Sequence, residues 1–198
     1  TRTFSSVVNA GAGVYTTTYT GVVSGTAQTL SVTVDGVTLS PNVTVAVVPG
    51  TAHLANCSLT VTSPTVVSGN FVTVSATLKD INNNTIDSGI TVTFSKTGGT
   101  STGTFNSVTN AGNGVYNVRY TGVTAGTAQT LAVLINGSDL GLSSSVSVLT
   151  GAPSPTTSSI SIASSTVTSG QAVTVTATIK DDNNNPVTGG VAITFSKT

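Results

Sequence analysis

The chain of 198 residues repeats itself at an offset of 101 positions, and this repeat constrains its fold more than any other feature. The stretch NAGAGVYTTTYTG at residues 9–21 returns as NAGNGVYNVRYTG at 110–122, and TFSKT at 93–97 returns at 194–198, with no gap needed. A period near one hundred residues is too long for a solenoid unit that needs its neighbours for a core, and it matches one small globular domain per repeat. The sequence therefore predicts a tandem array of domains.

Within each repeat, apolar residues alternate with Thr or Ser, which is the pattern of half-buried β-strands. The stretch FVTVSATLKD at 71–80 predicts one buried face, and the remaining strands repeat the pattern. The residues expected on buried faces are Val72, Val74, Ala76 and Leu78, then Val173, Val175, Ala177 and Ile179, then Ile90, Val92 and Phe94, then Tyr116, Val118 and Tyr120, and finally Leu131, Val133 and Ile135. No stretch combines a helix cap with a helical stripe.

The turns between these strands are typical of antiparallel β-structure. Asp35-Gly36 and Asn136-Gly137 occupy equivalent positions, and both dipeptides tolerate the positive φ angles of a two-residue type I′ hairpin. The Asn-rich stretches at 79–89 and 180–190 predict loops, because Asn and Asp cap their own backbone and adopt left-handed conformations. About seven strands in a hundred residues without helices favour an all-β fold of tandem immunoglobulin-like antiparallel β-sandwich domains with period 101.

The period also places the domain boundaries. We expect residues 1–48 to be the second half of an immunoglobulin-like domain, 58–150 a complete domain and 159–198 the first half of a further domain. Two equivalent stretches containing Pro, Gly and Thr, at 49–57 and 151–158, are the expected linkers.

Composition argues against several classes of function. Charged residues make up 6% of the chain, the net charge is zero, and there is no Glu, Met or Trp, with one His and one Cys. Clustered Lys and Arg are therefore missing, so nucleic acid and an anionic membrane surface are not expected partners. No apolar run approaches the length of a transmembrane helix and no signal peptide begins at Thr1, so membrane insertion of this segment is not expected.

The first half of the repeat resembles bacterial immunoglobulin-like domains of the intimin and invasin type, group 1. The stretches that carry this resemblance are SLTVTSPTVVSGNFVTVSATLKDINNNTIDSGITVTFS and SISIASSTVTSGQAVTVTATIKDDNNNPVTGGVAITFS. The second half, NAGNGVYNVRYTGVTAGTAQTLAV, is similar to the closing segment of that family and to the G-x-Y-x-V-x-Y strand of filamin repeats. The resemblance implies a spacer or adhesive repeat of a large cell-surface protein, and it carries over no catalytic residues. In the complete domain, Thr85-Ile86 replaces the Pro186-Val187 that matches the family pattern.

Asp80, Asn82 and Asn84, and likewise Asp181, Asn183 and Asn185, have the alternate-residue oxygen spacing of a calcium loop. The glycine and the bidentate Glu that such loops need are missing, so a self-capped turn is the favoured interpretation and no metal or cofactor is predicted.

No catalytic residue is predicted either. His53 lies in a linker without a partner residue, so we interpret it as a solvated side chain rather than a general base. Cys57 has Ser158 as its equivalent, which makes it a tolerated small residue outside the repeat design. Lys79 and Lys180 next to Asp invite an internal isopeptide bond, but alternation places Lys79 outward. The Asn-x-Ser/Thr sequons at Asn42, Asn56, Asn83 and Asn136 are expected by chance in this composition, and a surface glycan stays open.

Eight of the nine aromatic residues form repeat-equivalent pairs, which indicates core positions, whereas Phe71 is matched by Ala172. Phe71 is thus the one aromatic residue that the sequence offers as a ligand contact.

The two ends are complementary halves of one repeat, separated in an unbroken array by four residues equivalent to Gly98–Ser101. A half sandwich would expose apolar side chains and open strand edges. Two explanations remain open: either the chain is a window on a longer array interrupted in a flexible loop, or separate chains complete each other head to tail. The near absence of charged edge residues favours an assembled state.

The sequence as a whole predicts a non-enzymatic, extracellular or cell-surface structural protein of bacterial type. Its repeats would act as a mechanical spacer and assembly unit of a stalk, fibre or filament, with neighbouring copies of the same repeat as partners. The alternative is an adhesin domain that binds a glycan or a surface protein.

Overall fold

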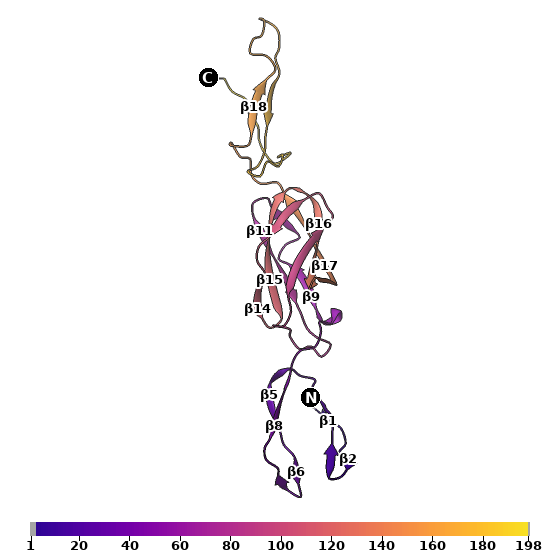
Figure 1. Cartoon of the computed structure of the whole chain (residues 1–198). Helices are drawn as coiled ribbons and strands as arrows, with labels where there is room; N and C mark the ends of the chain where they lie inside the picture. Colours follow the sequence, from indigo (N-terminus) through magenta and orange to yellow (C-terminus); the bar gives the residue numbers. More distant parts are fainter. Residues whose placement is uncertain (1–2, 198) are drawn as a thin grey trace. The chain divides into compact units, whose positions relative to one another are not determined.

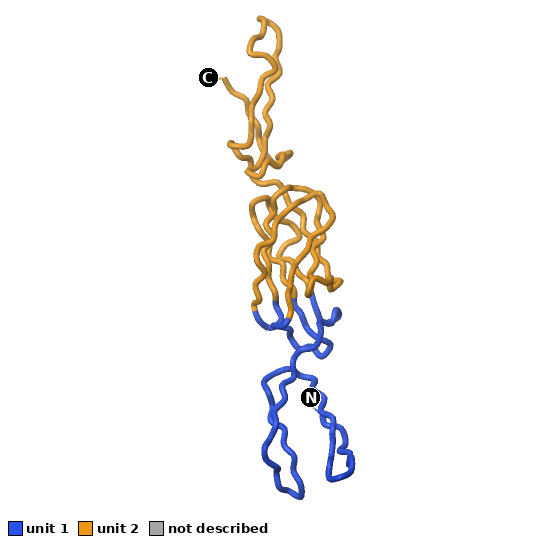
Figure 2. Tube along the Cα trace, in the orientation of Figure 1, with its two compact units in different colours: residues 1–58, 77–89, 112–115 blue, residues 59–76, 90–111, 116–198 orange. Residues whose placement is uncertain are grey.

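The computed structural model describes residues 3–197 and is built from β-strands, with a single 3-10 turn, η1 (Leu54–Asn56), in the segment expected to be a linker (Figure 1). Its residues fall into two compact units (Figure 2). One unit holds the residues through 58 together with 77–89 and 112–115, and the other holds 59–76, 90–111 and 116–198.

Residues 58–149 form two sheets. The four-stranded sheet has the order β10-β17-β16-β12, and its strands are β10 (Thr65–Val67), β17 (Ser138–Leu149), β16 (Gly126–Ile135) and β12 (Val92–Thr97). The five-stranded sheet has the order β13-β15-β11-β9 with β14 added beside β15, and its strands are β13 (Thr102–Phe105), β15 (Val115–Thr124), β11 (Phe71–Thr77), β9 (Ser58–Val61) and β14 (Thr109–Gly112).

The two sheets share one hydrophobic core, so they form a sandwich. The core draws on β11 and β15 of one sheet and on β10, β16 and β17 of the other, with Val66, Val72, Val74, Val118, Tyr120, Leu131, Val146 and Val148 as its buried members. The predicted alternation is confirmed here, because Val72, Val74, Ala76 and Leu78 are buried. Tyr116, Val118 and Tyr120 are buried as well, as are Val92, Leu131 and Val133, while Ile90, Phe94 and Ile135 are half-buried.

Two details of the expected sandwich are wrong. The structure has nine strands here instead of about seven, because the short strands β10 and β14 pair separately. The sandwich is also not purely antiparallel, since β10 runs parallel to β17 with Val66 opposite Val148. The physical reason is that the chain leaves the five-stranded sheet after β9 and crosses to the edge of the other sheet, where it meets β17 running in the same direction.

The predicted two-residue hairpins are confirmed. Asn136 and Gly137 have φ of 50° and 82° and connect β16 to β17, where Ile135 is opposite Ser138. Asp35 and Gly36 have φ of 46° and 82° and connect β6 (Thr33–Val34) to β7 (Val37–Thr38) in the same way. The Asn-rich loops likewise contain left-handed residues, Asn83 and Asn184.

The stretch that the sequence repeats around NAGNGVY forms the hairpin between β14 and β15. Three successive residues, Gly112, Asn113 and Gly114, have φ of 80°, 54° and 74°. Since a residue with a Cβ is strained in this region, the two glycines of the repeated stretch are explained by the turn that they form.

Residues 3–48 form strand pairs rather than a sandwich. Their strands are β1 (Thr3–Phe4) with β4 (Tyr19–Thr20), β2 (Val8–Gly11) with β3 (Val14–Thr16), β5 (Gly25–Leu30) with β8 (Val43–Val47), and β6 with β7. Side chains whose equivalents are buried in the sandwich are exposed here: Tyr15 is 65% exposed and Val32 is 61% exposed, whereas Tyr116 and Val133 are 5% and 0%.

The last part of the chain shows the same behaviour. Here β18 (Ser159–Ile162) pairs antiparallel with β19 (Val175–Thr178). Ile160 is 70% exposed and Phe195 is 57% exposed. These segments therefore have the local strand pattern of the repeat without the opposite sheet that would cover it.

The loop at Gly98–Ser101 is hydrogen-bonded to the start of β16. Thr100 and Thr127 exchange hydrogen bonds, each backbone N–H donating to the hydroxyl of the other at 2.9 Å, and Ser101 N–H donates to the Thr127 carbonyl. Ser101 is 1% exposed. Three backbone N–H groups thus connect this loop to β16 through hydrogen bonds.

Candidate functional site

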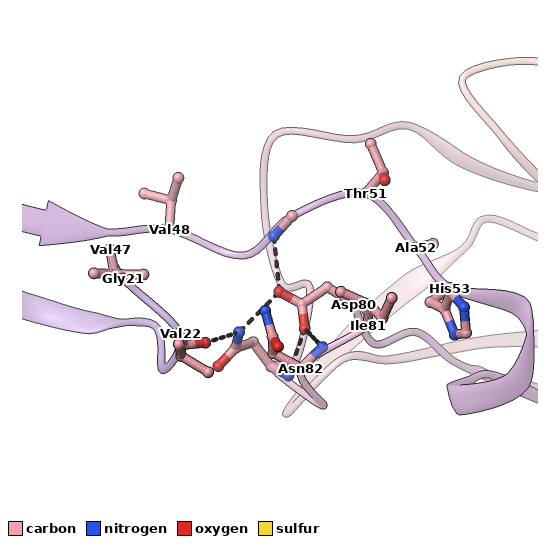
Figure 3. Close-up of a pocket in the computed structure, with 12 residues that line it drawn as sticks. Gly21, Val22, Val47, Val48, Thr51, Ala52, His53, Asp80, Ile81 and Asn82 are labelled. Atoms are coloured by element: carbon pink, nitrogen blue, oxygen red, sulfur yellow. Dashed lines mark hydrogen bonds between the residues drawn. The ribbon is translucent and has the colours of Figure 1, made fainter. Parts of the chain in front are cut away.

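Two equivalent hydrogen-bonded clusters lie 101 residues apart in the sequence. The first clasp consists of Val22, Ser24, Gly50, Asp80 and Asn84, and the second clasp of Val123, Ala125, Gly151, Asp181 and Asn185. Each clasp lies within one of the two compact units. Figure 3 shows the first clasp without Ser24.

The carboxylate of Asp80 is at the centre of the first clasp and is 2% exposed. Its Oδ1 accepts the backbone N–H groups of Asn82 and Asn84 at 2.8 and 2.9 Å, so the Asn-rich turn is self-capped as predicted. Its Oδ2 accepts the N–H of Gly50 at 2.9 Å and the side-chain amide of Asn84 at 2.8 Å. Both oxygens therefore accept two hydrogen bonds each.

These hydrogen bonds determine the charge state of Asp80. Burial by itself raises the pKa of the carboxyl group, but the side-chain hydrogen bond from Asn84 and the backbone hydrogen bonds from Gly50, Asn84 and Asn82 outweigh it and lower the pKa from 3.8 to about 2. The pKa of Asp181 is lowered by the same balance, with burial opposing hydrogen bonds from the Asn185 side chain and from Gly151, Asn185 and Asn183. Both carboxylates are thus ionised at neutral pH.

Asn84 extends the network to the segment at residues 22–24. Its Nδ2 donates to the Val22 carbonyl at 2.8 Å, and its Oδ1 accepts the Ser24 N–H at 2.9 Å. The Asn84 side-chain amide thus pairs with one backbone N–H and with a carbonyl two residues away. A neighbouring β-strand pairs with backbone groups in the same way. Asn84 therefore joins the end of one β-segment to the loop of another.

The second clasp repeats this arrangement. Asn185 donates to the Val123 carbonyl at 2.8 Å and accepts the Ala125 N–H at 2.8 Å, while Asp181 accepts the Gly151 N–H at 2.8 Å. Ser68 adds a further contact, since its hydroxyl donates to Val123 O and accepts from Asn185 Nδ2. The repetition in sequence is thus matched by a repetition of hydrogen bonds.

The stretches expected to be linkers, 49–57 and 151–158, also form hydrogen bonds with the Asn-rich turns. The N–H of His53 donates to the Lys79 carbonyl at 2.8 Å, and Ser154 donates in the same way to the Lys180 carbonyl at 2.7 Å. The Asn56 side chain donates to the Asp80 carbonyl at 2.7 Å. Its equivalent Thr157 donates to the carbonyl of Asp181 at 2.7 Å.

Cys57 also takes part, so the interpretation that its thiol lies outside the repeat design is wrong. Its Sγ donates to the Lys79 carbonyl and accepts the Lys79 N–H, both at 3.3 Å. The hydroxyl of Ser158 makes the same two contacts with Lys180, at 3.2 and 3.0 Å. A thiol therefore replaces a hydroxyl because both groups can donate to a carbonyl and accept from an N–H. The two lysines contribute their backbone groups here, not their amines.

A pocket of about 350 Å³ adjoins the first clasp (Figure 3). Its lining is contributed by Gly21, Val22, Val47, Val48, Gly50, Thr51, Ala52, His53, Asp80, Ile81, Asn82 and Asn84. The lone pairs of Asp80 are taken by N–H donors, and the side chain of His53 is exposed. Among residues 3–197, no three or more His, Cys, Asp or Glu side chains are grouped so that they could hold a metal ion. The polar groups of the site thus bind one another through hydrogen bonds.

The sequence indicates the residues of this site but not the distant residues that they bind. The spacing of Asp80, Asn82 and Asn84 predicts a self-capped turn and nothing further. In the structure, Asn84 also binds Val22, about 60 positions earlier, and Asp80 binds Gly50, about 30 positions earlier. A detectable signal existed, because Val22, Gly50, Asp80 and Asn84 all recur unchanged at an offset of 101. Two of the sequon side chains also make hydrogen bonds: Asn56 donates to the Asp80 carbonyl in this network, and Asn136 accepts the Thr91 N–H at the β16–β17 hairpin.

The shared core and the strand order define an all-β immunoglobulin-like sandwich of the kind found in bacterial surface adhesins. Residues 54–151 match the family model described as invasin, domain 3. The family is not one of enzymes, and no curated protein gave a significant match to the chain.

Three solved structures are similar over nearly the whole chain. FdeC, an adhesin of Escherichia coli, is 28% identical with a TM-score of 0.66, over 95% of this chain and 60% of that one. InvD of Yersinia pseudotuberculosis is 23% identical with a TM-score of 0.61, over 94% and 61%. Invasin, a bacterial integrin-binding protein, is 19% identical with a TM-score of 0.60, over 95% and 40%.

The chain thus spans 40 to 61% of the length of these three structures. The likeness to InvD and invasin describes the fold. Among residues 3–197, no helix has the length and apolar character that spanning a membrane requires.

Proposed function

We propose that this chain is a structural repeat segment of a bacterial cell-surface or secreted adhesin, without enzymatic activity. In this proposal residues 58–150 are one complete immunoglobulin-like repeat, 49–57 and 151–158 are its linkers, and 1–48 and 159–198 belong to neighbouring repeats. The repeats act as a mechanical spacer, and the two clasps hold successive repeats together.

The observation that carries the proposal is the recurrence of the whole clasp. The local turn is complete with the hydrogen bonds to Asn82 and Asn84. The additional contacts with the Val22 carbonyl and the Gly50 N–H connect it to other segments. The first clasp connects residues 22–24, the linker residue Gly50 and the turn at 80–84. The second clasp connects the equivalent segments in the same way. The similarity to the FdeC adhesin supports a location on the cell surface.

Physically, the clasp replaces a freely rotating linker by a joint. Each clasp has a buried carboxylate with its acceptor sites filled and an amide that bridges backbone groups. Hydrogen bonds to a charged group are stronger than neutral ones, and removing one partner leaves buried groups unpaired. The joint therefore resists bending until several hydrogen bonds break together.

The proposal is tested by the range of conformations that the junctions adopt. We expect the double variant Asn84→Ala and Asn185→Ala to broaden the distance distribution between spin labels placed on either side of each linker. Asn82→Ala is the matched control, because Asn82 enters the clasp through its backbone N–H. Equal distributions in the double variant and the control would exclude the clasps as joints between repeats.

We further propose that the exposed faces of residues 3–48 and 159–197 are covered by repeats of the same kind, either in a longer chain or in another copy. The support is the contrast between equivalent side chains: Val32 is 61% exposed and Val133 is fully buried. If the neighbouring repeat has the register of β12 and β16, in which Thr93 is opposite Leu134, then Thr194 lies opposite Thr33 of that repeat.

This register can be tested with cysteines in the 198-residue chain, after Cys57→Ser removes the native thiol. We expect Thr33→Cys and Thr194→Cys to form disulfides between copies under mild oxidation, visible as a ladder on a non-reducing denaturing gel. Thr33→Cys with Ser196→Cys, which lies two residues out of register, is the control. Equal cross-linking of the two pairs would contradict the assigned register.

A further inference from the structure

The outer face of the five-stranded sheet carries a cluster that the spacer role does not require. Phe71, at the start of β11, is 50% exposed, as the sequence suggested. The guanidinium of Arg119 in β15 lies over its ring, with its central carbon 4.3 Å from the ring centroid. A pocket of about 270 Å³ adjoins Arg119, and its lining consists of Thr73, Asn106, Ser107, Thr109, Asn117, Val118 and Arg119.

This cluster contains hydrogen-bonding groups that no other part of the described chain uses. The Oδ1 atom of Asn117 is buried and has no hydrogen-bond donor within residues 3–197. The Arg119 side chain packs on Phe71, and no carboxylate of the described chain is within ion-pair distance of it. A buried acceptor without a donor is costly, so its retention calls for an explanation. The cluster therefore presents one cation to an external molecule, and it holds an unpaired acceptor in the wall of the adjoining pocket.

The internal repeat shows that the fold does not need these side chains. Phe71 is replaced by Ala172, Arg119 by Thr18, Asn117 by Thr16 and Asn106 by Ser5 at the equivalent positions. The repeat thus places small residues on this face elsewhere, and large polar or aromatic ones in residues 58–150 alone. The other side of the same strands, with Val72, Val118 and Tyr120, forms the core and is kept similar between repeats.

The local structure holds the cluster in place. Asn106 accepts the N–H of Arg119 through Oδ1 at 2.7 Å and donates its own N–H to the Arg119 carbonyl at 3.2 Å. The Phe71 ring restrains the guanidinium by a cation–π contact. A planar guanidinium that is held in this way is prepared to bind a carboxylate through two parallel hydrogen bonds.

We propose that this surface, formed by Phe71, Asn106, Asn117 and Arg119, binds a sugar unit that carries a carboxylate, as part of an acidic glycan. The carboxylate pairs with Arg119, and the exposed part of the Phe71 ring contacts the apolar C–H groups of the sugar. A sugar hydroxyl in the pocket donates to Asn117 Oδ1, which requires the Asn117 side chain to rotate and turn this buried atom toward the pocket. The pocket is smaller than typical sites for drug-sized ligands, which suits a single sugar ring. An acidic peptide would also pair its carboxylate with Arg119 and can donate an N–H to Asn117, but the apolar C–H face of a sugar ring matches the exposed ring of Phe71.

The inference goes beyond the spacer function and does not depend on it. It is tested with the full 198-residue chain by ¹H–¹⁵N NMR titration with sialyllactose and with a disaccharide ending in glucuronic acid. Lactose and a neutral disaccharide are the matched uncharged probes, and a short Asp-containing peptide represents the competing class. We expect saturable shifts at Asn106, Asn117 and Arg119 with at least one acidic sugar, and affinity at least about tenfold lower for its neutral counterpart.

The repeat itself supplies variants that the fold accepts. Arg119→Thr and Phe71→Ala introduce the residues found at the equivalent positions, and we expect about tenfold and several-fold weaker binding, respectively. Lys197→Thr removes a positive charge outside the cluster and should leave the affinity unchanged. The proposal is overturned if neither acidic sugar produces saturable shifts at millimolar concentration, if Arg119→Thr binds as well as the parent, or if the peptide binds more tightly than both sugars.

Discussion

Replacement of Asp80 by Asn should destabilise the sandwich of residues 58–149. The carboxylate accepts four hydrogen bonds, two at each oxygen, and is 2% exposed. An amide can accept at its oxygen only, so two of the four donors face an NH₂ group and lose their acceptor. Each unpaired buried donor costs about 1 to 3 kcal/mol. Because the turn can relax toward water, we expect the lower part of this range, about 2 to 3 kcal/mol in total.

Urea unfolding at neutral pH measures this loss. The chain has no Trp, so near-ultraviolet circular dichroism of the buried Tyr116 and Tyr120 reports on the sandwich. With a urea dependence of about 1 to 1.5 kcal/mol per molar, the midpoint should fall by about 2 M. Asp182→Asn is the control, since it removes an exposed carboxylate with the same change in charge. If Asp80→Asn and Asp182→Asn unfold within about 0.5 kcal/mol of each other, the carboxylate network does not stabilise the fold.

The same residue predicts a pH dependence. The folded pKa of Asp80, about 2, lies below its ordinary value of 3.8. The unfolded chain therefore binds the proton more readily, and the stabilisation is complete above about pH 5 and is lost as the pH falls through the folded value near 2. The parent chain should lose up to about 2 kcal/mol over this window. Asp80→Asn should lose less, and a parallel loss in both chains would show that other groups cause it.

Further predictions concern the thiol and the exposed faces. Cys57→Ser should stay within about 0.5 kcal/mol of the parent in urea unfolding, because Ser158 makes the same contacts, whereas Cys57→Ala should cost about 1 kcal/mol for the lost hydrogen bonds. A Cys57→Ala variant as stable as the serine variant would show that the contacts contribute nothing. Val133→Ala removes two methyl groups from the core and should lower the free energy of unfolding by about 2 kcal/mol. The equivalent Val32→Ala should change it by less than about 0.5 kcal/mol as long as no other copy covers the exposed face around Val32. A large effect of Val32→Ala at high protein concentration alone would indicate that copies of the chain cover this face.

Much of the fold can be predicted from the sequence, because the features concerned depend on neighbouring residues. Alternation along β11 and β15 assigns Val74, Val118 and Tyr120 to the core since successive side chains of a strand point to opposite faces. Asn136-Gly137 predicts its hairpin because both residues tolerate positive φ. In the candidate site, the self-capped turn of Asp80 is equally local, since its Oδ1 binds N–H groups two and four residues further on.

Features that depend on distant segments could not be predicted in this way. The parallel pairing of β10 with β17 joins residues about 80 positions apart, and alternation along one strand does not identify its neighbour. Arg119 alternates with the buried residues of β15, and only the adjacency of β11 and β15 places it on Phe71. The role of Asn84 likewise required the position of the Val22 carbonyl.

The sequence by itself determined the repeat, its strand pattern and its tight turns, because backbone preference and side-chain alternation act over a few residues. The tertiary structure decided which polar groups meet, because hydrogen bonds need donors and acceptors within about 3 Å in a suitable direction, and only the folded chain creates that geometry. The Asp-x-x-x-Asn spacing of the turn was therefore visible in the sequence, whereas its use as a joint became visible when the loops before and after it were placed beside it.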